Sequence, residues 1–184
     1  MHILARTTLH VAALAASTFL FSGSAAAQAT GNNNMHFKGR LVAEPCSLAP
    51  GSAQRELHFL SVPVKDMYST GRSISRPITV HLQNCNIAEG WTNIKVTFMG
   101  TESLPLPGFL QLDGGGATGV AIGLETADHR SLPLHKATQV GKLVVGNNDL
   151  TFMAFLKGEP DALKDRKIGL GDTNATVTFA FSYD

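Results

Sequence analysis

Residues 174–184 read Asn-Ala-Thr-Val-Thr-Phe-Ala-Phe-Ser-Tyr-Asp, and this last stretch of the 184-residue chain decides the fold. One face carries Ala175, Val177, Phe179, Phe181 and Tyr183, whereas the residues between them are small or polar. A period of two is typical of a β-strand with one buried face. No further strand follows in the sequence, so we expect a strand from another protein to pair with this one.

The first 27 residues have the features of a signal peptide. Arg6 gives a positive start, and residues 9–21 form an apolar run that is too short to span a bilayer comfortably. Small residues follow, with an A-x-A cleavage site at residues 25–27. We expect cleavage after Ala27. Cleavage after Ala29 is the alternative, and an uncleaved membrane anchor is the less favoured interpretation.

The charge balance of the mature chain argues against several kinds of partner. Residues 1–27 contain a single charged side chain, so the remaining 157 residues carry 14 basic and 14 acidic side chains. This length corresponds to one domain. No basic block remains to bind nucleic acid. No later stretch reaches 18 apolar residues, so we expect no stable membrane insertion after signal cleavage.

The two cysteines, Cys46 and Cys85, both lie in the exported part of the chain. An even number of cysteines in an oxidising compartment predicts one disulfide. Cys85 has the opposite parity from the apolar residues before it, so a bulge or a strand end is needed to bring it to Cys46. A metal site is the alternative, although two isolated thiols lack the ligand spacing that zinc uses.

Alternating segments recur along the chain without a sustained helical period outside the signal peptide. We expect six main strands, which begin near residues 35, 78, 94, 120, 150 and 174. Leu57 and Phe59 suggest a further short strand, residues 67–77 a loop, residues 146–149 a turn, and residues 160–166 one helical turn. These features predict a single all-β sandwich.

The segment before the first cysteine changes character part-way. Residues 28–34 are polar and are predicted to form a flexible arm. Met35, Phe37, Gly39 and Leu41 then share one face, and Asn33 continues it as a polar residue. A glycine inside a strand often marks a close approach by another backbone or side chain. The alternative is an ordinary first strand of the sandwich.

The sequence predicts no catalytic residue, metal site or cofactor. Five histidines remain after signal cleavage, all at polar strand positions or in turns: His36, His58, His81, His129 and His135. No serine lies in a G-x-S-x-G elbow. The glycines at 114–116 lack the following Lys-Ser or Lys-Thr of a phosphate-binding loop. Convergence of His58, His81 or His129 on carboxylates would favour an enzyme.

Several motifs occur in order along the mature chain: Phe37-Lys38-Gly39, Leu41-Val42, Pro45-Cys46, residues 78–85, 96–102 and 119–124, Gly171-Asp172, residues 175–179, and Tyr183. Taken together, they resemble the pilin subunits of the chaperone–usher pathway. The resemblance covers nearly the whole mature chain. Gly71-Arg72-Ser73, Leu106-Pro107-Gly108 and residues 160–163 are most similar to the minor tip adaptors of P pili. Thr173 differs, because the family usually has an aromatic residue there.

The resemblance implies an incomplete immunoglobulin-like β-sandwich that lacks its seventh strand. It implies a signal peptide over residues 1–27, an N-terminal donor-strand extension over residues 28–41 and a pilin domain over residues 42–184. The donor residues would be Asn33, Met35, Phe37, Gly39 and Leu41, and the acceptor groove would lie along Ala175, Val177, Phe179, Phe181 and Tyr183. Strand addition to an exposed sheet edge is a general recognition mode, of which chaperone–pilin complexes are an example.

The resemblance also implies the partners and the location. A periplasmic chaperone would fill the groove first, and at the outer-membrane usher the extension of a neighbouring pilin subunit would replace the chaperone strand. The protein would pass through the periplasm and end in a cell-surface fimbrium that serves adhesion. Two alternatives remain at this point: a tip adhesin that binds a host glycan, and a secreted β-sandwich enzyme.

Overall fold

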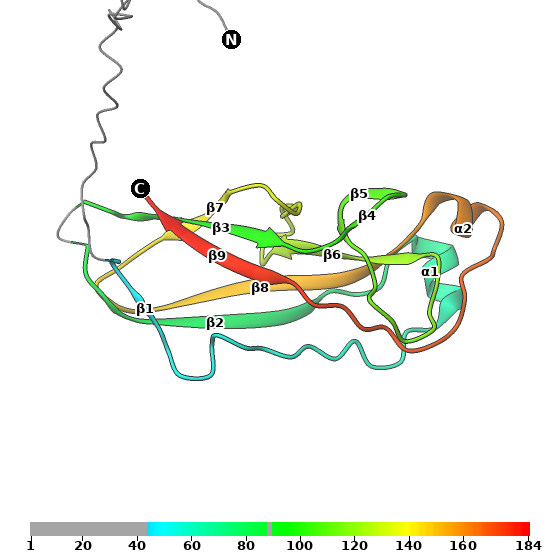
Figure 1. Ribbon diagram of the computed structural model, residues 1–184, viewed down its shortest axis with the longest axis horizontal. Coiled ribbons are helices and arrows are strands. Elements are labelled where there is room, and N and C mark those ends of the chain that lie inside the picture. The colour runs from blue at the N-terminus through cyan, green and yellow to red at the C-terminus, as the bar shows by residue number, and fades with distance from the viewer. Residues whose placement is uncertain (1–43, 88–89) are drawn as a thin grey trace, which may run out of the picture. The chain divides into compact units, whose positions relative to one another are not determined.

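The computed structural model describes residues 44–87 and 90–184 (Figure 1). The expected signal peptide lies outside these residues. The expected extension, with Asn33, Met35, Phe37, Gly39 and Leu41, lies outside them as well.

The described part of the chain folds into two antiparallel sheets. The larger sheet has the order β1 (Ser47–Leu48), β2 (Arg76–Cys85), β8 (Gly146–Gly158), β6 (Val120–Thr126), β5 (Leu106–Leu110) and β4 (Glu102–Ser103). The smaller sheet has the order β7 (Thr138–Lys142), β3 (Asn93–Met99) and β9 (Thr178–Tyr183). Two short helices, α1 (Val64–Thr70) and α2 (Pro160–Lys164), lie at the end of the sandwich away from β1 (Figure 1). The predicted all-β class is confirmed.

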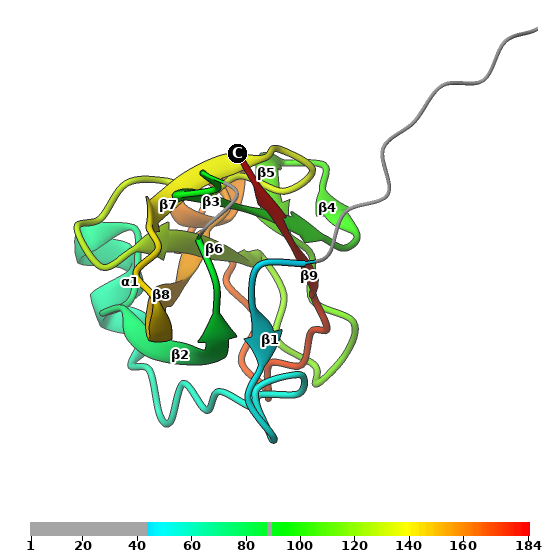
Figure 2. The same cartoon turned by 90° about the vertical axis from the view of Figure 1, so that its left-hand side faces the viewer.

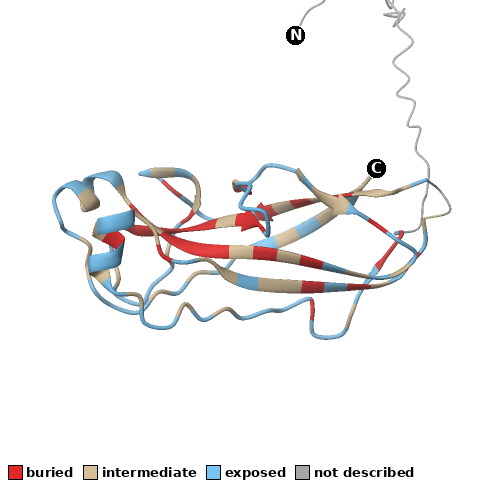
Figure 3. Ribbon diagram, turned by 180° about the vertical axis from the view of Figure 1, so that it is seen from behind, coloured by how far each residue is buried: buried red, intermediate tan, exposed pale blue. Residues whose placement is uncertain are grey.

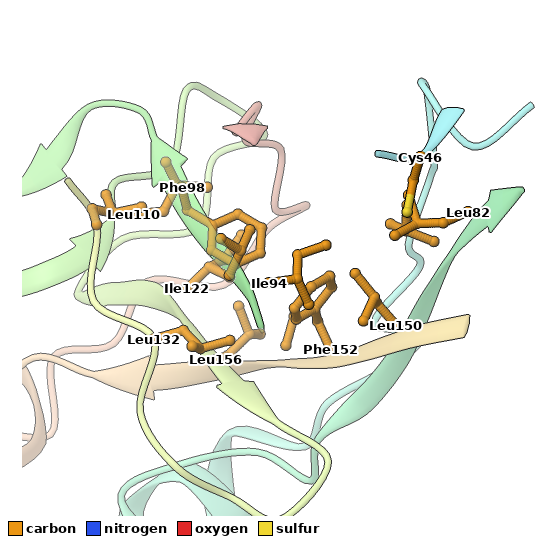
Figure 4. Close-up of a cluster of buried hydrophobic side chains, with 14 of the residues drawn as sticks. Cys46, Leu82, Ile94, Phe98, Leu110, Ile122, Leu132, Leu150, Phe152 and Leu156 are labelled. Carbon is orange, nitrogen blue, oxygen red and sulfur yellow. The ribbon is translucent and has the colours of Figure 1, made fainter. Parts of the chain in front are cut away.

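The core lies between the two sheets. Apolar side chains of β3 meet those of β2, β6 and β8, and the buried segments in Figure 3 follow these strands while the helices are largely exposed. Figure 4 shows Ile94 and Phe98 beside Phe152. The rings of Phe98 and Phe152 pack edge to face with centroids 5.3 Å apart, a favourable arrangement for aromatic pairs.

The predicted disulfide joins Cys46 to Cys85. Leu82 pairs with Asn148 and Cys85 with Gly146, so β2 advances three residues while β8 advances two. This bulge reverses the parity of Cys85, which is why a cysteine on the polar face of the sequence pattern is buried in the structure. The bond ties the first described residues to the end of β2.

Gly123 makes room for an aromatic pair on the outer face of the larger sheet. A Cβ atom at Gly123 would lie 2.4 Å from Cζ of Phe155 and 2.7 Å from Cε1 of Phe109. The two rings meet edge to face at 6.1 Å, and the Arg72 guanidinium lies 3.5 Å from the centroid of the Phe155 ring. Glycine is therefore required here by packing rather than by backbone conformation.

Four local predictions were wrong. The first part of the loop predicted at residues 67–77 belongs to α1, because Met67 is buried and Gly71, at φ +72°, ends the helix with a hydrogen bond to the Met67 carbonyl. Residues 146–149 begin β8 instead of forming a turn, because they pair with the end of β2. Leu57 and Phe59 pack against the core without forming a strand. Strand β7 was not predicted, since Val140 is its only large apolar residue.

The predicted helical turn is confirmed, but the predicted number of strands is not. The helical turn at residues 160–166 is confirmed as α2. The strand count differs from the six predicted: the described residues contain nine strands, and two of these, β1 and β4, have only two residues each. Two residues are too few to show alternation, and the two strands are defined only by their pairing, β1 with the distant strand β2 and β4 with the neighbouring strand β5.

Replacing Gly123 with alanine should destabilise the fold. The added methyl group would press on Phe155 and Phe109, and overpacking of this kind costs about 1–3 kcal/mol. Gly141→Ala is the matched control, since no atom lies within 4 Å of a Cβ there. Thermal unfolding of the two purified variants measures the difference. Equal melting temperatures would show that the aromatic pair moves aside freely.

Candidate functional site: an open groove beside the last strand

Strand β9 lies at the edge of the smaller sheet. Within residues 44–87 and 90–184 it pairs with β3 only, in a continuous register from Ile94↔Tyr183 to Met99↔Thr178. Its other edge has no strand neighbour in this part of the chain (Figures 1 and 2). The backbone N–H and C=O groups of that edge are therefore free to pair with another strand.

The inward side chains of the last stretch are only half-buried. Ala175, Val177, Phe179, Phe181 and Tyr183 all pack against the core without reaching full burial, and the residues between them are exposed. In contrast, Ile94, Val96 and Phe98 on the neighbouring strand β3 are 0%, 1% and 5% exposed. The alternation predicted from the sequence is confirmed, and burial falls off sharply from the centre of the sheet to its edge.

The strand is shorter than predicted. It begins at Thr178, because the preceding residues are held by a different segment of the chain. Asn174 forms a bridge with Gly114, and the Thr176 amide donates to Oδ2 of Asp113 at 2.8 Å. Residues 172–176 thus form one wall of a groove before the chain enters the sheet.

The groove has a volume of about 1140 Å³. Residues 55–62 line one side and residues 168–177 line the other. Between them lie apolar side chains from the core face of the larger sheet, including Ile122, Leu124 and Ala154. Of the five predicted groove residues, Ala175 and Val177 line this cavity, and Phe179, Phe181 and Tyr183 continue the apolar face along β9.

The other sheet edges differ from that of β9. Strand β7 ends in Lys142, and Lys136 precedes it by two residues. Strands β1 and β4 have only two residues each, and Pro45 and Pro50 flank β1. Lysine, proline and short length are common protections against edge-to-edge pairing. The six residues of β9 contain no charge and no proline, so this edge is the best suited to accept a strand.

The far end of β9 is fixed by polar contacts. Asn93 and Asp184 exchange two backbone hydrogen bonds, and Nζ of Lys95 lies 2.7 Å from Oδ2 of Asp184. Burial raises the pKa of the Tyr183 hydroxyl, and the nearby Glu44 carboxylate adds to this effect. The start of the described chain therefore lies near the end of its last strand.

The histidine–carboxylate contacts do not form a shared site in the described residues. His58 is 3.9 Å from Glu56, His81 is 2.6 Å from Asp149 and His129 is 2.8 Å from Glu125. Each pair involves a different carboxylate. No group of three potential ligands that could hold a metal ion is found among the same residues.

Glu125 is the centre of a buried polar network that the sequence did not reveal. Its Oε1 accepts hydrogen bonds from Arg72 at 2.9 Å and Ser75 at 2.5 Å, and lies 2.8 Å from Nδ1 of His129. Burial by itself would raise the pKa of this carboxyl, but the hydrogen bonds from Arg72, Ser75 and His129 lower it to about 2. A carboxylate with this pKa is a poor general base near neutral pH, so we assign the network a structural role.

A sequence model of the family described as "Fimbrial protein" matches residues 35–184. The chain belongs to this fimbrial family. Among its relatives, this fimbrial protein is 34% identical to the uncharacterised fimbrial-like protein YfcP of Escherichia coli strain K12, over 83% of this chain and 84% of YfcP. It is 32% identical to the fimbrial adapter PapK of Escherichia coli, over 89% of this chain and 94% of PapK.

A solved structure supports the same fold. A chain from a chaperone–usher pilus superposes on this fimbrial protein with a TM-score of 0.66 at 23% identity, covering 84% of this chain and 97% of the other. Together with the family match and the identity to PapK, this fold confirms the resemblance to chaperone–usher pilins close to the P-pilus adaptors. The named relatives are fimbrial proteins, so the family-level assignment favours a structural subunit over an enzyme. No helix in the described part of the chain has the length and apolar character to cross a membrane.

Glu125→Gln should reduce stability in a pH-dependent way. A carboxyl whose pKa is lowered from 4.5 to about 2 on folding stabilises the protein above pH 4.5, and this contribution is lost as the pH falls toward 2. The variant should therefore be less stable than the wild type at pH 7, and the difference should shrink below pH 4.5. Unfolding by denaturant across this range measures it.

Glu56→Gln is the matched control, because Glu56 also faces a histidine but has a side chain that is 91% exposed. Its effect on the free energy of unfolding should be small at every pH. A constant effect of Glu125→Gln from pH 7 to pH 2 would contradict the assigned ionisation.

Proposed function

We propose that this fimbrial protein polymerises by donor-strand exchange. In this proposal its groove accepts a chaperone strand and then the extension of one neighbouring pilin, while its own residues 28–41 enter the groove of another. The observation that carries the proposal is the six-residue unprotected edge of β9 beside a large apolar groove, with inner side chains left half-buried. A strand placed there would complete both the hydrogen bonding and the core.

The extension has the pattern that such a groove needs. Residues 33–41 span the same length as residues 175–183, and each segment places five residues on one face. Every named strand pair in the described structure is antiparallel, and antiparallel pairs are the more common kind. We therefore expect an antiparallel donor. Burial of Met35, Phe37 and Leu41 would contribute roughly 5–9 kcal/mol before ordering costs.

The partners and domain limits follow from the same proposal. Residues 1–27 direct export, residues 28–41 form the donor extension and residues 42–184 form the pilin domain. An uncovered apolar edge promotes aggregation, so a periplasmic chaperone protects the groove until the outer-membrane usher brings the next subunit. The protein then resides in a cell-surface fimbrium that serves adhesion.

Within the fimbria we assign this chain the role of a minor adaptor. The similarity to the adapter PapK covers nearly the full length of that protein. A subunit that ends a fibre would lack an open docking site at one end of its groove, whereas the groove here extends to Ala175 and Val177 at the start of the last stretch. A donor extension and an open groove in one chain suit a connector between two other subunits.

Phe37→Arg should block incorporation into fibres while leaving the chaperone complex intact. The charged side chain would enter an apolar groove in the neighbour, and a buried unpaired charge is strongly unfavourable. The chaperone binds the groove of the same molecule, which this substitution does not touch. Usher-dependent polymerisation of the purified chaperone complex measures the effect. His36→Arg is the control, because His36 lies on the opposite face of the extension.

Normal assembly of the Phe37→Arg protein would refute donor-strand exchange through residues 33–41. Equal loss of assembly by His36→Arg would point to a general effect of positive charge instead.

Phe179→Arg should reduce the yield of soluble chaperone complex, because it places a charge on the inner face of the acceptor strand. Thr178→Arg alters the exposed face of the same strand and should leave the yield nearly unchanged. Co-purification of each variant with the chaperone from periplasm provides the measurement. Similar yields for both variants would show that the chaperone binds elsewhere.

A further inference from the structure

Two exposed valines form an apolar knob on the connection between β7 and β8. Val144 is 59% exposed and Val145 is 71% exposed. The backbone beneath them is held in place. Leu143 is buried and its amide donates to the Thr92 carbonyl, while the Asn148 side chain exchanges two hydrogen bonds with the backbone of Val144. These hydrogen bonds hold the backbone that carries the two valines in place on the surface.

The knob lies close in the fold to Pro45 and Cys46, near the start of the described chain. Gly146, which follows Val145, pairs with Cys85, and Cys85 is bonded to Cys46. The Asn86 amide also donates to the Pro45 carbonyl at 2.7 Å. In Figure 1 this end of the sandwich carries β1 and the C-terminus, opposite the helices. Any partner that holds the extension close to Cys46 must therefore come close to the valines.

The length of the connecting segment sets how close that partner must be. This step rests on the proposed donor-strand exchange, in which Leu41 is seated in the groove of the accepting pilin. Five residue steps then separate Leu41 from Cys46, which limits the distance between their Cα atoms to about 18 Å even in a fully extended chain. The end of the sandwich that carries the knob must therefore stand at the mouth of the partner's groove.

The direction of the donor strand determines at which end of the acceptor groove Leu41 leaves it. An antiparallel donor runs from the Tyr183 end of the acceptor strand toward its start, so Leu41 leaves the groove near the position of Ala175. In this chain two exposed leucines stand at the groove lining, Leu60 at 71% and Leu170 at 78% exposure. A second contact at this mouth requires the accepting pilin to carry apolar side chains at the equivalent positions, and the experiment below tests this.

We propose that Val144 and Val145 form a second contact with the pilin that accepts this chain's extension, by packing on apolar side chains at the mouth of its groove, at the positions that Leu60 and Leu170 occupy here. The contact is small compared with the donor strand, so it adds little to the strength of the joint. Its effect is to restrict rotation about the short connection between the extension and Cys46. It therefore sets the angle between this subunit and the one that accepts it.

Site-specific photo-crosslinking in assembled fimbriae tests this contact. A benzophenone amino acid is placed at Val145 of the full-length chain in cells that produce the fimbriae, and the crosslinked peptides are identified by mass spectrometry. We expect crosslinks to the pilin that holds residues 33–41, at the positions equivalent to Leu60 and Leu170. The control is the same probe at Ile74, which is 73% exposed near the helical end of the molecule and should not reach that pilin.

A second variant separates local contact from simple proximity. With the probe moved to Val144, Val145→Asp should reduce the crosslink yield several-fold without reducing the amount of the protein in fimbriae. If both probes are excluded from fimbriae but recovered in chaperone complexes, while the Ile74 probe is incorporated, added volume at the knob prevents joining and the contact is supported.

The outcomes distinguish this inference from the proposed function. If the Val145 probe is incorporated but gives no crosslink to the accepting pilin, or crosslinks away from its groove mouth, the second contact is refuted and donor-strand exchange is unaffected. If Phe37→Arg is incorporated normally, donor-strand exchange is refuted and this inference fails with it.

Discussion

An unpaired strand edge beside an unfilled core is the constraint on which the rest of this structure depends. Backbone groups on the free side of β9 have no partner among the described residues, and the side chains that should close the sandwich remain half-exposed. Leaving such groups unsatisfied is costly and invites non-specific pairing. The remaining edges are short or carry lysine and proline, which directs strand addition to one place. Among the described residues, every sheet edge except that of β9 therefore carries such protection.

Much of this site could be predicted from the sequence because it depends on local alternation. The parity of Ala175 through Tyr183 was sufficient to identify both the strand and its inner face. The pairing of Cys46 with Cys85 followed from the cysteine count and the compartment. The parity conflict at Cys85 indicated either a bulge or a strand end, and the structure contains a bulge there. Properties that repeat every two residues survive into the folded state because the pleat of a strand enforces them.

Features that depend on contacts distant in sequence were not predictable in this way. Strand β9 begins only at Thr178, because the Thr176 amide donates a hydrogen bond to Asp113, 63 residues earlier in the sequence. Glu125 can be buried because it is hydrogen-bonded to Arg72 and Ser75, which lie about fifty residues earlier in the sequence, just before β2. The requirement for glycine at position 123 comes from two phenylalanines on different strands. The groove itself arises between residues 55–62 and 168–177, two irregular segments that no periodic pattern relates.

The disulfide has a mechanical consequence for a fibre built from such subunits. Tension along the fibre would enter each subunit through the extension and reach Cys46, which immediately precedes the two-residue strand β1. Strand β1 alone would peel away under a small load. The covalent link to Cys85 transfers the force to the end of β2, a ten-residue strand paired along its length with β8. The load is then carried in shear by the many hydrogen bonds between β2 and β8 at once. The disulfide thus protects the sandwich at β1, where hydrogen bonding alone would be weakest.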